Sequence, residues 1–282
     1  MGGSKDERGT VLVVAGSPPM PGGAILAGTA ALRAGAGKLK IATSERVATA
    51  VATAVPEAHV LSLRMSGAGV PSSGAIEALT DCAAGADAVL IGPGMVGEDG
   101  MRRWLPAVLA RLAKTTSGTV VLDAATLALL GRRPRVLSPF HGRAILTPHA
   151  GEMATLCGLT KGDVERAPRE LAAAMSRKLG AVVALKGAVT FVAGPGGELF
   201  RNEAGNVGLA TCGSGDVLAG IVAGLAGRGA DPLRATAWAV HVHARCSIAL
   251  ARRRGGALGL LARELLDDVP GILASLSRGR SR

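Results

Sequence analysis

The chain has 282 residues, of which 48% are apolar, 2% are aromatic and none is tyrosine. That length allows one large α/β domain or two small ones, with a core built from Ala, Val, Leu and Gly. The net charge of +11 is typical of a nucleic-acid-binding protein. However, the aromatic side chains on which bases stack are nearly absent, and arginines concentrate at 252–254 and in the C-terminal tail. We therefore favour a basic surface that attracts anionic nucleotides.

The cysteines and the N-terminus indicate the cellular compartment in which we expect the protein. The four cysteines are widely spaced without a C-x-x-C pair, so they predict neither a disulfide framework nor a zinc site, and free thiols fit a reducing cytoplasm. The polar start lacks the apolar core of a signal peptide. No run of about eighteen uncharged apolar residues, the length of a membrane span, occurs.

Short apolar runs bounded by Gly, Pro or Asp predict buried strands. In chain order these runs are Val11–Ala15, Lys38–Thr43, Ala86–Ile91, Thr119–Leu122, Ala144–Thr147 and Val182–Leu185. A Gly-Pro-Gly-Gly turn between Thr190–Ala193 and Leu199–Arg201 predicts a hairpin.

Helical segments alternate with these strands. Gly23–Ala36 is rich in Ala and Leu, Trp104–Lys114 tolerates Pro106 only in its first turn, and nearly everything from Val217 onward is helical in character. This alternation predicts an α/β fold with a mostly parallel sheet covered on both faces. Without a repeat, linker or break in composition, we expect a single domain over 1–282, with residues 1–9 and 275–282 as frayed tails.

Polar and glycine-rich residues recur where the predicted strands end. They are Ser17, Gly94, Asp123, His149 and Lys186. Ligands of open α/β sheets bind at the carboxyl ends of the strands, so these residues predict a binding crevice there.

The most informative segment is Gly213-Ser214-Gly215-Asp216, which precedes an apolar helical run. Glycines let backbone amides converge on one point, and the start of a helix adds free N–H groups and a positive dipole end. A carboxylate beside such an anion site makes sense if it takes a proton from a hydroxyl that is joined to a phosphoryl group. The alternative is a plain turn with Asp216 as helix cap; we favour the catalytic interpretation.

Two further motifs favour ligand binding. In Thr147-Pro148-His149, the proline aims His149 into the crevice, and we favour a substrate contact over a helix-capping turn with a solvent-facing His. Glu152 follows three residues later, but one His and one Glu are too few ligands for a closed zinc site. Lys186-Gly187 ends a strand, where lysine can offset phosphate charge, although a surface lysine before a turn is the simpler alternative.

Three other positions stay open. Gly92-Pro93-Gly94 fits a backbone surface against which a substrate lies, or a tight turn without a ligand. Asp123 fits a residue that holds Mg²⁺ through water or orients a substrate, or a cap of the following helix. His241 and His243 lie in an apolar helix, where packing in the core is the commoner role, and we assign them none.

Taken together, six segments resemble the ADP-dependent NAD(P)H-hydrate dehydratases, a family of the ribokinase-like superfamily. The segments are Gly16–Ala24, Leu32–Gly37, Ile91–Gly94, Leu146–His149, Leu185–Gly187 and Gly213–Asp216. The resemblance extends from about residue 11 to about residue 270. It implies a ribokinase-like three-layer α/β/α sandwich with a mostly parallel central sheet.

The resemblance also implies a reaction and its partners. The family uses ADP, or ATP in eukaryotic relatives, to phosphorylate the ring hydroxyl of the S-form of hydrated NADH or NADPH. Loss of phosphate then restores NAD(P)H and leaves AMP. The implied co-substrate is ADP with Mg²⁺. The chain resembles the stand-alone form, which would work with a separate NAD(P)H-hydrate epimerase, and we expect a homo-oligomer that binds neither nucleic acid nor membrane.

The family pattern implies roles for individual residues. The hydrated dinucleotide would contact Ala24, Gly94, His149 and Asp216, with Asp216 as catalytic base. The adenine nucleotide would contact Lys186, Gly187, Ala188, Val189, Thr190, Gly213, Ser214 and Gly215. The sequence departs from the pattern at Gly23, where alanine is usual, and at Cys212, where glycine is common.

Two alternatives to the dehydratase are weighed. A ribokinase-like small-molecule kinase, for hydroxymethylpyrimidine or hydroxyethylthiazole, would use the same Gly-Ser-Gly-Asp segment but release a stable phosphorylated product. Thr147-Pro148-His149 together with Gly92-Pro93-Gly94 favours the dehydratase. A non-catalytic binding protein is disfavoured, because pure anion binding gains nothing from the carboxylate of Asp216.

Overall fold

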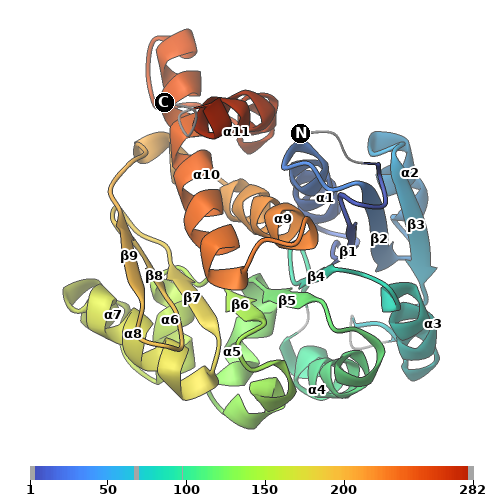
Figure 1. Ribbon diagram of the computed structural model, residues 1–282. Coiled ribbons are helices and arrows are strands. Elements are labelled where there is room, and N and C mark those ends of the chain that lie inside the picture. The colour runs from blue at the N-terminus through green and yellow to red at the C-terminus, as the bar shows by residue number, and fades with distance from the viewer. Residues whose placement is uncertain (1–3, 67–69, 97, 279–282) are drawn as a thin grey trace.

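The computed structural model describes residues 4–66, 70–96 and 98–278 as one nine-stranded sheet with helices on both faces (Figure 1). The strand order is β3-β2-β1-β4-β5-β6-β7-β8-β9. Neighbours from β3 to β7 pair in parallel, whereas β7–β8 and β8–β9 pair antiparallel. The predicted α/β class with a mostly parallel sheet is thereby confirmed.

The strands follow the apolar runs closely. Their bounds are β1 Thr10–Val14, β2 Lys38–Ser44, β3 Ala58–Leu63, β4 Ala88–Ile91, β5 Thr119–Leu122, β6 Ala144–Leu146, β7 Val182–Leu185, β8 Thr190–Ala193 and β9 Leu199–Asn202. Residues of β4, β5, β6 and β7 are all buried, as expected of strands covered on two faces. The predicted hairpin is confirmed as β8 and β9.

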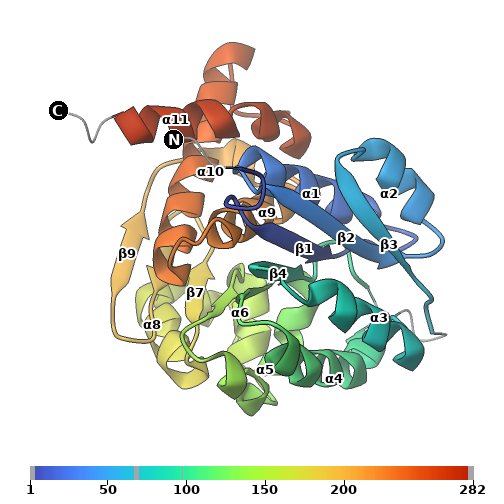
Figure 2. The same cartoon turned by 45° about the vertical axis from the view of Figure 1, so that its right-hand side comes forward.

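Two groups of helices cover the two faces of the sheet. One face carries α1 Gly22–Arg33, α2 Ala48–Ala54, α9 Ser214–Gly227, α10 Pro232–Arg254 and α11 Val269–Arg278, with the 3-10 segments η3 Val207–Leu209 and η4 Ala262–Asp267 alongside. The other carries α3 Ser73–Ala83, α4 Glu98–Thr115, α5 Leu127–Leu130, α6 Ala150–Cys157, α7 Lys161–Arg166 and α8 Pro168–Leu179, with η1 Ala124–Thr126 and η2 Pro134–Phe140. Figure 2 shows α1, α9 and α10 above the sheet and α3, α4 and α5 below it.

Two apolar cores result from this arrangement. Along β1, the side chains of Val11 and Val13 join the core under α1 and α9, whereas Leu12 and Val14 join the core under α3 and α4. This alternation is the two-residue period of a strand. The three-layer α/β/α sandwich is therefore confirmed.

Helix α4 differs from its predicted bounds. It begins at Glu98 rather than Trp104, so Pro106 lies inside the helix and not in its first turn. Pro106 lacks the N–H that would donate to the carbonyl four residues earlier. Burial of Trp104, Leu105 and Leu109 against the sheet outweighs that missing hydrogen bond.

The expected tails fall partly outside the described residues, which begin at residue 4 and end at residue 278. Within them, Lys38 forms an ion pair with Asp6, the Gly37 amide donates to the Arg8 carbonyl, and residues 275–278 belong to α11. None of the described helices has both the length and the continuous apolar character needed to cross a membrane.

Candidate active site

The carboxyl ends of three neighbouring strands bring the predicted site residues together. Asp123 follows β5, Thr147 follows β6 and Lys186 follows β7, and these strands pair in register. The Lys186 amide donates to the Pro148 carbonyl at 2.8 Å, and His149 forms a bridge with Lys186. The crevice expected at this edge therefore gathers residues from segments more than sixty positions apart.

Asp123 orients Lys186. The Asp123 carboxylate accepts a hydrogen bond from Lys186 Nζ at 3.2 Å and another from Thr147 Oγ1 at 2.7 Å, and it makes no side-chain bond to the turn that follows. Of the two interpretations left open for Asp123, helix capping is therefore not what the structure shows. Asp123 is only 3% exposed, so water screens its carboxylate little and the carboxylate acts strongly on the charge of Lys186.

Lys186 lies among three carboxylates. Its Nζ is 3.9 Å from Glu152 in addition to its bond with Asp123. Burial acts to lower the pKa of Lys186, but Asp123, Glu152 and Asp216 together outweigh burial, and the net pKa is raised. Lys186 thus keeps its positive charge at neutral pH in a partly buried position.

Asp216 lies in the first turn of α9, which starts one residue after Gly213 in the left-handed conformation (φ +85°). Burial raises the pKa of Asp216 to about 6; Asp123 and Glu152 add to this rise, and Lys186 opposes it. A carboxylate with a pKa near the working pH is mostly ionised at pH 7 and still accepts a proton readily. Asp216 therefore has the properties of a general base.

Free backbone amides lie at the same turn. Among the described residues, the Gly215 and Asp216 amides donate no hydrogen bond. A Cβ on Gly215 would lie 3.3 Å from Lys186 Nζ, so the lysine charge sits directly against this turn. Two amides without a hydrogen-bond acceptor, a helix N-terminus and an ammonium group are the kinds of donor from which anion sites are built.

His149 caps a helix. It is the first residue before α6, where its Nδ1 accepts from the Glu152 amide at 3.1 Å and its own amide donates to Glu152 Oε2 at 2.8 Å. The capping role, which we had judged the weaker alternative, is therefore present. Its Nε2 lies 3.5 Å from Glu152 Oε1, and the side chain is 59% exposed at the sheet edge.

Gly94 and Ala24 lie beside the same edge, and both are buried. Gly94 has a left-handed backbone (φ +63°), and its carbonyl accepts from Ser17 Oγ at 2.7 Å. Ala24 is fully buried and its amide donates to the Pro21 carbonyl, so the structure does not bring its side chain to the site. A Cβ on Gly23 would lie 2.5 Å from the Gly94 amide, which explains why glycine suits position 23 here.

The residues expected to bind the nucleotide form two adjacent segments. Gly187 and Ala188 are exposed in the turn between β7 and β8, and Val189 and Thr190 are partly buried. Lys186 joins this turn to Gly213–Asp216, because its Nζ lies against Gly215. The sequence analysis did not predict the bond between Asp123 and Lys186 or the proximity of Glu152 to Lys186. The only sequence signal for the bond was an acidic residue at the end of a strand.

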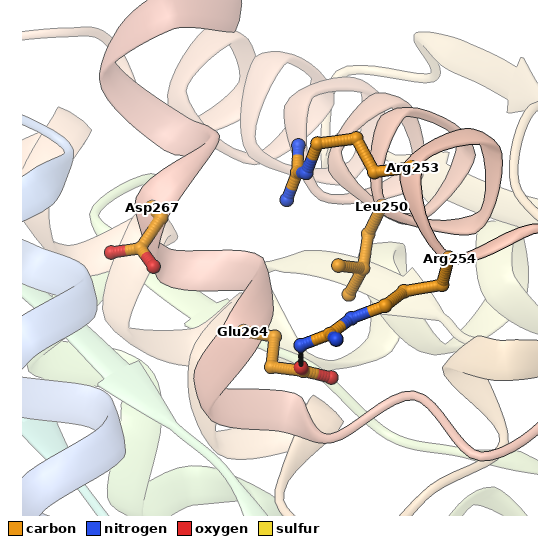
Figure 3. A pocket seen from close by; sticks show the side chains of 5 residues that line it. All are labelled: Leu250, Arg253, Arg254, Glu264 and Asp267. Carbon is orange, nitrogen blue, oxygen red and sulfur yellow. Dashed lines mark hydrogen bonds and ion pairs between the residues drawn. The ribbon is translucent and has the colours of Figure 1, made fainter.

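A separate cavity of about 240 Å³ lies between α10 and η4 (Figure 3). It is lined by Leu250, Arg253, Arg254, Glu264 and Asp267. Its charges are paired with neighbours, since Arg254 bonds to Glu264 and Arg253 bonds to Asp268. No predicted site residue lines this cavity, and nothing in it indicates a ligand.

Comparison with solved structures defines the class of fold. A ribokinase-like superfamily protein from Enterococcus faecalis matches with a TM-score of 0.81 at 26% identity, over 97% of this chain and 89% of the other. The ADP/ATP-dependent NAD(P)H-hydrate dehydratase of Bacillus subtilis, co-crystallised with ATP/Mg²⁺, matches with a TM-score of 0.77 at 30% identity, over 97% of this chain and 91% of the other. The fold is ribokinase-like.

Sequence comparison narrows the class to one family. A family model described as NAD(P)H-hydrate dehydratase matches residues 11–270. The ADP-dependent (S)-NAD(P)H-hydrate dehydratase of Xanthomonas campestris pv. campestris is 48% identical over 278 residues, which are 99% of this chain and 92% of that protein. The chain belongs to the NAD(P)H-hydrate dehydratase family.

Proposed function

We propose that this protein is an ADP-dependent (S)-NAD(P)H-hydrate dehydratase, a lyase that returns hydrated NADH or NADPH to the normal dinucleotide. The observation that carries this proposal is the Asp216 carboxylate, whose pKa of about 6 is combined with the free amides of Gly215 and Asp216 and the charge of Lys186. The family and the relatives described above support the choice of substrate.

The first step transfers a phosphoryl group. The ring hydroxyl of the hydrate attacks the terminal phosphorus of ADP, the bond from that phosphorus to the bridging oxygen breaks, and AMP leaves. Asp216 accepts the hydroxyl proton. The Gly213–Gly215 segment and Lys186 hold the phosphoryl oxygens, because fixed donors and a fixed positive charge stabilise the charge that this group carries.

The second step removes the phosphate. Phosphorylation turns a poor leaving group into a good one, and the lone pair of the ring nitrogen expels phosphate as the C–O bond breaks. Loss of a proton from the adjacent ring carbon restores the double bond. The balance is hydrate plus ADP giving NAD(P)H, AMP and phosphate, with no change in oxidation state of the dinucleotide.

The site divides between the two substrates. We place the hydrated dinucleotide against Gly94, His149 and Asp216, and the nucleotide against Lys186–Thr190 and Gly215, which is the division that the family pattern implies. The family pattern adds Ala24, which, being buried, would act only by shaping the start of α1.

Mg²⁺ fits this site as an ion carried by the nucleotide. The described residues contain no cluster of three or more His, Cys, Asp or Glu that could hold a metal ion, and Mg²⁺ commonly binds through one or two carboxylates together with substrate phosphates. When bound, it would neutralise charge on the phosphates. Asp123, Glu152 and Asp216 are the carboxylates beside Lys186 that could contribute a ligand.

The decisive experiment mixes the protein with hydrated NADH, Mg²⁺ and either ADP or ATP, and follows the reduced-nicotinamide absorbance. We expect absorbance to recover with formation of AMP when ADP is used. A stable phosphorylated product without recovery of absorbance would indicate the kinase alternative instead.

Asp216→Asn tests the catalytic residue in the same assay. The variant should bind ADP but turn over at least about a hundredfold more slowly, which is the scale of a lost general base. Calorimetric titration with ADP provides the control for binding. Recovery of NADH by the variant at close to the wild-type rate would contradict the assigned role.

Three wider aspects remain proposals. We propose a cytoplasmic location, a homo-oligomeric state, and functional pairing with a separate NAD(P)H-hydrate epimerase that supplies the S-form. Size-exclusion chromatography with light scattering tests the second. Faster repair of a mixed R and S hydrate after addition of an epimerase tests the third.

A further inference from the structure

His243 is a buried histidine that the proposed reaction does not use. It lies midway along α10, is only 7% exposed, and points toward the first turn of α9 on the neighbouring helix. Helices α9 and α10 pack side by side on the same face of the sheet (Figure 1). A polar side chain in that position needs a hydrogen-bond partner, because an unpaired one is costly in an apolar interior.

The partner is Ser214, the first residue of α9. His243 Nε2 lies 3.1 Å from Ser214 Oγ, and Ser214 is itself only 4% exposed. The residue before it, Gly213, has no side chain and cannot cap the helix. Within the described part of the chain, His243 is the one side chain that is hydrogen-bonded to residues 214–217, and it contacts both the hydroxyl and the backbone of Ser214.

The turn that this bond holds is the turn that presents the anion site. Ser214 immediately precedes Gly215 and Asp216, whose amides have no acceptor among the residues described. Free amides can bind an anion only if the backbone keeps them pointing at it. Gly213 and Gly215 lower the local stiffness of this backbone, because glycine restricts φ and ψ least.

The imidazole is also electrically suited to this position. Burial lowers the pKa of His243 to about 4, and the positive charge of Lys186 adds to this effect. His243 is therefore neutral at pH 7, so it holds Ser214 without adding a second positive charge to the anion site.

We propose that His243 is a positioning residue: through Ser214 Oγ it fixes the first turn of α9 so that the amides of Gly215 and Asp216 face the phosphoryl group. The inference rests on the proposed function for the identity of the anion, but the bond itself and its effect on the turn do not depend on the dehydratase reaction.

The test uses His243→Leu, which removes the hydrogen bond, and His243→Gln, which can retain it through the amide nitrogen. We expect His243→Leu to lower kcat about tenfold, the effect of losing one neutral hydrogen bond. The Kd for ADP should rise several-fold, while KM for hydrated NADH stays within about twofold. His243→Gln should restore most of the loss, and His241→Gln, altered on the same helix but away from Ser214, is the matched control and should behave as wild type.

A double-mutant cycle with Ser214→Ala identifies the path of the effect. If His243 acts through Ser214, the double variant loses no more than Ser214→Ala alone. The proposal is overturned if the two losses multiply, or if both His243 variants lower the melting temperature but leave kcat and ADP affinity unchanged. If His243→Leu does not fold, the kcat and ADP affinity of His243→Gln and Ser214→Ala still test the proposal.

ADP affinity separates this inference from the proposed function. If the wild type binds ADP and the variants weaken that binding in the expected pattern, but hydrated NADH is not converted, then the dehydratase proposal fails and the positioning role stands. If hydrated NADH is converted and the variants leave both kcat and ADP affinity unaffected, the positioning role fails alone.

Discussion

At the scale of single residues, the site is a balance of charges around Lys186. Three carboxylates surround one ammonium group, so the four charges sum to −2 when all are ionised. Asp123 is bonded to Lys186 at 3.2 Å, whereas Asp216 faces the lysine without such a bond. Burial, together with the excess negative charge, raises the pKa of Asp216, and burial and the Asp123 charge also raise the pKa of Glu152.

The raised pKa predicts that Asp216 reduces stability at neutral pH. In the folded protein its pKa is about 6, and in the unfolded chain it is about 3.9. Between these values the folded state holds a proton that the unfolded state has released, so this contribution to stability falls as pH rises through that window. Asp216→Asn should therefore stabilise the protein by about 2 kcal/mol above pH 6 and have little effect below pH 4.

Urea unfolding of wild type and Asp216→Asn at pH 4 and pH 7.5 measures this difference. Asp81→Asn, a change at an exposed carboxylate outside the site, shows how much any loss of acidic charge contributes. An Asp216→Asn effect of the same size at both pH values would contradict the assigned origin.

His149 is predicted to act on one substrate more than the other. It lies at the sheet edge with a largely exposed imidazole, on the side where we place the hydrated dinucleotide. His149→Ala should raise KM for hydrated NADH by more than it raises the Kd for ADP. Because the cap to Glu152 is lost as well, His149→Asn serves as a control that can keep the cap. Equal losses for both ligands would argue against this placement.

At the scale of helices and strands, glycine sets the spacing between α1 and α9. A Cβ on Gly220 would lie 2.3 Å from the Ala27 carbonyl oxygen, and one on Gly224 would lie 2.6 Å from the Ala31 carbonyl oxygen. Both distances are shorter than any normal carbon–oxygen contact. The two helices therefore approach backbone to backbone, which explains the Gly and Ala spacing in both segments.

Gly220→Ala should destabilise the protein by about 1–3 kcal/mol, because the added methyl group forces the two helices apart. Gly271→Ala is the matched control: it lies in helix α11 with open space around the added Cβ, where alanine should be neutral or stabilising. Thermal unfolding of both variants measures the difference. If Gly220→Ala and Gly271→Ala unfold at the same temperature, α1 and α9 can move apart without loss of stability, which would contradict the prediction.

The sequence predicted some elements better than others for physical reasons. β5 and β7 match their predicted bounds because a fully buried parallel strand is a continuous apolar run that ends at a polar residue. β3 at the sheet edge was missed, since His59 and Ser62 interrupt its apolar character. The start of α4 was missed because its first turn is polar and Pro106 suggested a later beginning.

The site was predictable where the chemistry is local. Gly213–Asp216 lies on adjacent residues, so the anion site and its carboxylate could be inferred from the motif. The bond between Asp123 and Lys186 joins positions 63 residues apart, and the bond between Ser214 and His243 joins positions 29 apart. Such pairs depend on strand order and helix packing, which motif spacing does not contain.

At the scale of the whole molecule, ligand binding should be coupled to global stability. The nucleotide segments come from β7, which contributes side chains to both apolar cores, from the following turn, and from α9, which covers one face of the sheet. A ligand that binds only the folded state at a hundred times its Kd adds about 2.7 kcal/mol. We expect ADP with Mg²⁺ to raise the melting temperature by several degrees, both in wild type and in Asp216→Asn.

Differential scanning fluorimetry with increasing ADP measures this effect. Adenosine, which lacks phosphates, is the control and should give a much smaller shift, because the anion site would stay empty. A shift of equal size with adenosine would indicate that the phosphates are not held where we place them.

The direct backbone contact of α9 with α1 also limits which parts of the molecule can move during turnover. Because Gly220 and Gly224 lie directly against backbone carbonyl groups of α1, α9 has no room to slide along its axis or to rotate about it. We therefore expect any opening that admits a dinucleotide to arise in the connecting segment before α9, at residues 203–212, rather than in the body of α9.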